Sequence, residues 1–115
     1  MIRVLALLFV SVNATANAVS ELDHIGGQLR EVRSLPPGTK TDLHCPDDLN
    51  QFVGLSWQTV TAALGDPDNV NYDGNIFVYV LRAPKVRPSY GGGHPVLLIH
   101  VDSGIVKEVT CNYAE

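Results

Sequence analysis

The stretch Gly54-Leu-Ser-Trp-Gln-Thr-Val-Thr-Ala-Ala-Leu-Gly-Asp-Pro67 predicts a short helix that carries both a start signal and a stop signal. Ser56 is a good N-cap, because its hydroxyl can accept a hydrogen bond from a free amide of the first helical turn. Val60 and Leu64 lie one turn apart and give the helix an apolar face. Gly65 can adopt the left-handed conformation that ends a helix, and the proline two residues later prevents its continuation.

The residues directly upstream predict a second short helix. Pro46 suits a first helical turn, and the carboxylates of Asp47 and Asp48 favour the positive end of a helix dipole. The apolar residues that follow recur at helical spacing and stop at Gly54. We therefore expect two short helices, head to tail.

Downstream of the helices, three apolar segments rich in β-branched and aromatic residues predict strands over residues 76–81, 96–101 and 105–113. Asp102-Ser103-Gly104 reads as a tight turn that makes the last two strands an antiparallel hairpin. Residues 66–75, rich in Asp, Asn, Pro and Gly, read as a turn-containing loop. Residues 83–94 hold three consecutive glycines, and long ordered loops of this kind are disproportionately functional.

The pattern Gly54-x-Ser-x-x-x-Val-x-x-x-Leu-Gly-x-Pro67 resembles the signature of the SmpA/OmlA family, the BamE-like small proteins of outer-membrane assembly. In that family an aromatic-x-aromatic strand and a strand–turn–strand follow, matched here by Phe77-Val-Tyr79 and by residues 101–106. The resemblance implies an α+β domain over residues 45–115, in which two short helices pack on one face of a three-stranded antiparallel sheet (α-α-β-β-β). β-Lactamase-inhibitor-type domains have a similar layout, so the fold implies no single function.

Residues 1–18 have the features of a secretory signal peptide. Arg3 is followed by an apolar run, and Ala16-Asn17-Ala18 is a small-residue cleavage motif. The run is shorter than the roughly 20 residues that a transmembrane helix needs, and no cysteine follows it to accept a lipid. We expect cleavage after Ala18 and a periplasmic protein, neither membrane-spanning nor lipid-anchored, with secretion as the alternative.

Residues 19–44 are expected to form an N-terminal arm or linker. Their first half carries an approximate helical stripe of apolar residues: Leu22, Ile25, Leu29 and Val32. Gly26-Gly27 lies in the middle of that stripe, and glycine weakens a helix interior by about 1 kcal/mol relative to alanine. A weak helix or a partly ordered arm is the prediction.

The chain has two cysteines, Cys45 and Cys111. An even number of cysteines in a small exported domain favours a disulfide, with metal ligation or two free thiols as the alternatives. The bridge would close a long loop, for which the chain-entropy description gives roughly 4 kcal/mol of stabilisation.

The sequence predicts no catalytic, cofactor or metal site. The spacing of His44, Cys45 and His94 fits no close pair of metal ligands, and Ser89 lies near His94 without a nucleophile elbow. The 12 acidic residues against 8 basic ones, for a net charge of −4 at pH 7, argue against a nucleic-acid partner.

Two features are candidates for contact with a protein partner. Trp57 starts the second helix, and tryptophan is enriched at interface hot spots, although packing on the sheet is the alternative. Lys85, Arg87 and Tyr90 lie on the long loop, for which mere solvation is the alternative. The sequence thus predicts a non-catalytic binding module of the bacterial cell envelope, of the outer-membrane-assembly scaffold type; the alternative is a periplasmic inhibitor or immunity protein against an enzyme or toxin. The oligomeric state stays open.

Overall fold

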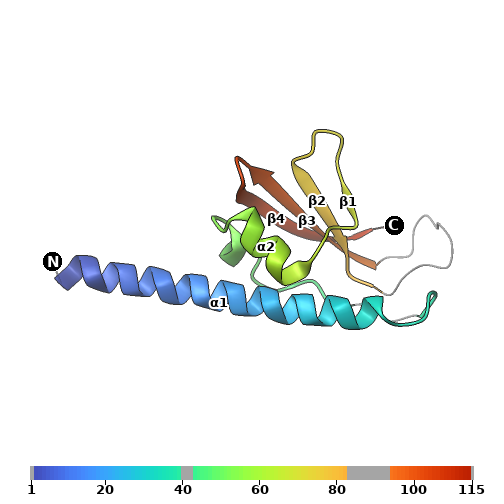
Figure 1. The fold of residues 1–115 in the computed structure, drawn as a ribbon, viewed down its shortest axis with the longest axis horizontal. Helices are drawn as coiled ribbons and strands as arrows, with labels where there is room; N and C mark the ends of the chain where they lie inside the picture. The colour runs from blue at the N-terminus through green and yellow to red at the C-terminus, as the bar shows by residue number, and fades with distance from the viewer. Residues whose placement is uncertain (1, 40–42, 83–93, 115) are drawn as a thin grey trace.

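The protein has an α+β fold in which helices and strands form two layers (Figure 1). The computed structural model describes residues 2–39, 43–82 and 94–114. Its elements in chain order are α1 (Ile2–Arg33), the 3-10 helix η1 (Asn50–Phe52), α2 (Trp57–Leu64), β1 (Asn69–Val70), β2 (Ile76–Val80), β3 (His94–Asp102) and β4 (Ile105–Ala114). The described strands form one antiparallel sheet in the order β1-β2-β3-β4, and one hydrophobic core joins its inner face to α1 and α2.

Helix α2 confirms the predicted start and stop signals. The hydroxyl of Ser56 accepts a hydrogen bond from the backbone N–H of Thr59 at 3.1 Å, as an N-cap should. Gly65 ends the helix with a φ of +80°. Val60 and Leu64 are both buried in the core. The boundaries of α2 are therefore set by its capping residues, and the orientation of α2 is set by its apolar face.

Two short helices are expected before the sheet, and the prediction of the first one, directly upstream of Gly54, is wrong. Residues 45–54 form only the single turn η1, and the second α-helix of the layer is α1. Helix nucleation is unfavourable, so a short segment confined between Pro46 and Gly54 has too few residues to recover that cost. The turn is held instead by Phe52, which is buried in the core.

Of the two alternatives predicted for the first half of residues 19–44, a weak helix or a partly ordered arm, the structure has the helix. Helix α1 continues to Arg33, and the apolar stripe of its second half is buried in the core: Ala18, Leu22, Ile25, Leu29 and Val32. Gly26 has a packing role in this helix, because a Cβ built there would overlap the carbonyl oxygen of Ala63 in α2. The glycine that weakens the isolated helix is what lets the two helices approach.

Two arginines in the last turn of α1 bind the C-terminal end of α2. Arg30 donates to the carbonyl of Ala63 at 3.3 Å, and Arg33 donates to the carbonyl of Asp66 at 3.4 Å. Arg33 also forms an ion pair with Asp68, 2.8 Å between Nη2 and Oδ2. A helix C-terminus carries free carbonyls and a partial negative charge, so these cations satisfy both.

The sheet has a fourth strand that the sequence did not predict. β1 pairs with β2 through Asn69 opposite Val78 and Val70 opposite Phe77. Two residues are too few to show the alternation that identifies a strand. β1 forms because the turn that follows it folds the chain back onto β2, which is a consequence of pairing rather than of local propensity.

The predicted hairpin of the last two strands is confirmed as β3 and β4, with a register shift between His100 and Val101. On the inner face of β2, the hydroxyl of Tyr79 donates to the carbonyl of Gly65 at 2.7 Å. Burial raises the pKa of Tyr79 above its ordinary value, so this phenol stays a neutral donor. Most of the predicted loop over residues 83–94 lies outside the described residues.

The predicted disulfide between Cys45 and Cys111 is confirmed. Its Cα atoms are 5.7 Å apart, and the two residues are separated by 66 positions. The bridge joins the segment before η1 to β4, so it ties the helical layer to the edge of the sheet.

The two neighbouring glycines of α1 allow a matched test of the helix packing. Gly26→Ala should lower the free energy of unfolding by about 1–3 kcal/mol, because its methyl group overlaps the α2 backbone. Gly27→Ala should raise it by about 0.5–1 kcal/mol, because its Cβ meets nothing closer than Arg30 at 3.9 Å and alanine favours helix. Urea denaturation of both variants measures the difference; stabilisation by both would contradict the α1–α2 contact.

Loss of the disulfide should lower the free energy of unfolding by up to about 4 kcal/mol, because the unfolded chain regains the freedom of a long loop. Urea denaturation with and without reductant measures this for the wild type. A Cys45→Ser, Cys111→Ser double variant is the control, and reductant should leave its midpoint unchanged. Two thiols that react with alkylating reagent in the unreduced wild type would show that the bridge does not form.

Candidate functional site

The structure places Trp57 against the sheet, in agreement with the packing alternative. Its side chain is half-buried and stacks on Phe77, with ring centroids 4.0 Å apart and an angle of 23° between the ring planes. Stacked aromatic pairs of this kind contribute about 0.5–1.5 kcal/mol beyond their buried area. Lys85, Arg87 and Tyr90 lie outside the described residues. Partner binding by any of these four residues stays a prediction.

The outer face of the sheet is a candidate contact surface. Alternate residues of β2 and β3 point away from the helices and form what we call the open sheet face: Ile76, Val78, Val80, Val96 and Leu98. The register places Val78 opposite Leu98 and Val80 opposite Val96, so the aliphatic side chains are contiguous. All five are half-buried. No described element covers them, since α1 and α2 pack on the inner face (Figure 1).

This composition is unusual for a sheet face that meets solvent. Antiparallel sheets with one face on the core normally carry polar side chains on the other. Here the polar side chains stand on β4 and at one end of β3, beside the aliphatic group: His100, Glu108, Thr110 and Asn112. An apolar patch bordered by polar residues marks an interaction site in many soluble proteins. The open sheet face therefore has the chemistry of a protein-contact surface.

One end of the open sheet face is hollowed. A depression of about 200 Å³ is lined by Ile76, Leu98, His100, Glu108 and Thr110. Two aliphatic side chains meet polar groups from the end of β3 and from β4 there, so the depression offers both apolar contact and hydrogen-bonding groups. The ring of His100 has Nε2 3.5 Å from the amide nitrogen of Asn75, which links this end of the face to the β1–β2 turn.

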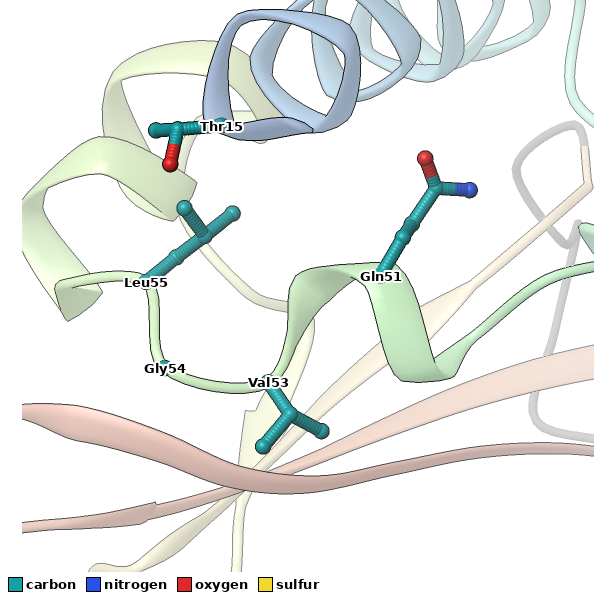
Figure 2. Close-up of a pocket in the computed structure, with 5 residues that line it drawn as sticks. All are labelled: Thr15, Gln51, Val53, Gly54 and Leu55. Carbon is teal, nitrogen blue, oxygen red and sulfur yellow. The ribbon is translucent and has the colours of Figure 1, made fainter. Parts of the chain in front are cut away.

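A second hollow lies between α1 and the segment that precedes α2 (Figure 2). It has about 260 Å³ and is lined by Thr15, Gln51, Val53, Gly54 and Leu55. Gln51 and Leu55 point toward α1, whereas Val53 points the other way (Figure 2). Thr15 belongs to the predicted signal peptide, so cleavage after Ala18 would remove one wall. The open sheet face, built wholly downstream of that position, is the better candidate.

The open sheet face is not among the sequence predictions, although the sequence carries a signal for it. Residues 76–80 and 96–99 are apolar at successive positions, so both faces of each strand carry apolar side chains. Such continuous runs are typical of strands covered on both sides. The sequence indicates a second cover for the sheet, but only the tertiary structure shows that the described helices supply just one.

No family model matches this chain, and the comparison with curated proteins gives no match. Within residues 2–39, 43–82 and 94–114, no helix combines the length and apolar character needed to cross a bilayer. Over the same ranges, no three His, Cys, Asp or Glu side chains gather where they could hold a metal ion.

Neighbouring leucines of β3 test whether the outer face is open in solution. Leu97→Ala should lower the free energy of unfolding by about 2–5 kcal/mol, because Leu97 is 1% exposed in the core. Leu98→Ala removes the same atoms from the open sheet face and should lower it by about 1 kcal/mol or less. Urea denaturation compares them, and equal losses would mean that both faces of the sheet are covered.

Proposed function

We propose that this protein is an exported, non-catalytic binding module that acts by protein–protein contact in the bacterial cell envelope. The observation that carries the proposal is the open sheet face, where contiguous aliphatic side chains stand without cover from the described residues. Burial of such a face by a partner is favourable at about 25 cal/mol per Å² of apolar area. Binding would thus supply the second cover that the described residues do not give this sheet.

Export is supported by the disulfide and by the first residues of the chain. Structural disulfides persist in oxidising compartments, and Cys45 and Cys111 are paired here. The signal-peptide features of residues 1–18 support the periplasm as the proposed site of action, with secretion as the alternative. We infer that the mature chain begins at Val19 and retains the half of α1 that packs on α2.

The resemblance of residues 54–67 to the SmpA/OmlA signature favours a scaffold in outer-membrane assembly or maintenance. In that role the module would hold a partner without changing it. A periplasmic inhibitor or immunity protein could use the same surface to block an enzyme or toxin. These roles differ in their partners, so identification of the bound protein separates them.

An affinity pull-down of the oxidised protein from envelope extract tests the proposal. We expect the wild type to retain a specific protein and Leu98→Lys to lose most of it, because a charge then stands in the middle of the apolar patch. Gln58→Lys adds the same charge to an exposed position of α2 and should retain the partner. Quantitative mass spectrometry of the eluates measures retention, and circular dichroism checks that both variants fold.

The identity of the partner distinguishes the two roles. Outer-membrane assembly components would support the scaffold, and one secreted enzyme or toxin would support the inhibitor. Combined replacement of Lys85, Arg87 and Tyr90 by alanine tests the predicted loop contact in the same assay. If Leu98→Lys retains partners as well as Gln58→Lys does, the open sheet face is not the contact surface.

A further inference from the structure

Tyr72 is fully exposed at the tip of the turn between β1 and β2. Its relative accessible surface is 103%, so the described parts of the chain take no apolar area of this ring out of water. The turn projects from the end of the molecule that lies opposite α1 (Figure 1). A tyrosine in this position contributes almost nothing to the core. Its large aromatic surface is available to a partner.

The turn that carries Tyr72 is held rigidly by its flanking asparagines. The side-chain oxygen of Asn71 accepts hydrogen bonds from the backbone N–H groups of Asn75 and Ile76, at 2.9 and 2.8 Å. The Asn71 amide also donates to the side-chain oxygen of Asn75 at 2.8 Å. The backbone is therefore ordered before any binding event. Less conformational entropy is lost when such a preorganised turn meets a partner.

The same turn is fastened to the end of the open sheet face. The backbone N–H of Val101 donates to the carbonyl of Asn75 at 2.8 Å, and the next residue, Ile76 at the start of β2, lines the hollow of that face. The base of the turn is thus fixed next to Ile76, a residue of the open sheet face.

This end of the molecule also carries negative charge. Asp73 is exposed beside Tyr72, Asp102 follows Val101 at the end of β3, and Glu108 is exposed at the rim of the hollow. Lys107, next to Glu108 in the chain, adds one positive charge against these three carboxylates. A recess that accepts the tip would be complementary if it combined apolar walls with lysine or arginine side chains.

We propose that the β1–β2 tip is a knob that inserts into a cleft of the partner protein, with Tyr72 in the cleft and Asp73 facing a basic side chain of its wall. This inference rests on the proposed function, because it assigns the shape and charge of the partner that the open sheet face meets. A projecting aromatic residue on a rigid turn fits a concave site better than a flat one. The partner class is therefore a folded protein with an open, basic-lined cleft.

Site-specific photocrosslinking in cells that produce the full chain tests the knob. With p-benzoyl-phenylalanine in place of Tyr72, irradiation should join the chain to one protein, and peptide mapping should place the adduct among residues that line a cleft. The same photoreactive group in place of Gln58, exposed on α2, is the positional control and should not yield that adduct. Absence of the adduct at position 72, or attachment to a flat surface, would overturn the knob.

The affinity of variants for the mapped partner then distinguishes the contribution of the Tyr72 ring from that of the Asn71 side chain that holds the turn. Tyr72→Ala should weaken binding about 30-fold, which corresponds to about 2 kcal/mol and is typical of an interface hot spot. Tyr72→Phe should keep most of the affinity if the ring supplies the contact. Asn71→Ala leaves the tyrosine but frees the turn and should weaken binding several-fold. Urea denaturation should show Tyr72→Ala to be as stable as the wild type, because the ring touches no core residue.

The two proposals fail in different ways. If Leu98→Lys releases the partner and Tyr72→Ala binds it with unchanged affinity, the protein is a binding module whose tip stays outside the interface, and the knob is refuted. If neither substitution alters binding, both the open sheet face and the knob are wrong. If the partner is a protein without a cleft at the mapped position, only the knob fails.

Discussion

The contact between Gly26 of α1 and the backbone of α2 at Ala63 is the constraint on which the helical layer depends. No side chain fits between the two helices at this crossing, so their separation is fixed by backbone atoms. The crossing brings the arginines of the last α1 turn onto the carbonyls that end α2. The close approach at Gly26 thus accompanies the capping of α2 by these two arginines.

The sheet is joined to this layer through side chains and backbone at several separate points. Tyr79 donates to the carbonyl that follows α2, and Trp57 stacks on Phe77 at the other end of the same helix. The segment before α2 pairs with the start of β4: the N–H of Gly54 donates to the carbonyl of Val106, and the N–H of Val106 donates to the carbonyl of Leu55, both at 2.9 Å. The disulfide of Cys111 adds a covalent link. The helical layer is thus joined to the sheet by hydrogen bonds, an aromatic stack and a disulfide.

Because the described helices cover only one face of the sheet, the other face is a candidate contact surface. All described helices pack on one side of the sheet. The aliphatic side chains of β2 and β3 that point to the other side are therefore only half-buried. Beside them stands the rigid turn that exposes Tyr72. A stable core on one side lets the protein keep an apolar surface on the other without losing its fold, which is what a preformed contact surface requires.

The sequence by itself determined the features that depend on local chemistry. The limits of α2 follow from Ser56 and Gly65, the β3–β4 hairpin follows from the turn at 102–104, and the cysteine pair follows from composition. Only the tertiary structure decided the features that depend on distant partners. Gly26 weakens an isolated helix, yet it permits the close helix crossing, so the choice between a weak helix and a partly ordered arm was decided by packing on α2. β1 and the η1 turn likewise exist because of what lies beside them in space, which leaves no local pattern in the sequence. The apolar runs of β2 and β3 are visible in the sequence, but only the tertiary structure shows that the described helices cover one of their two faces.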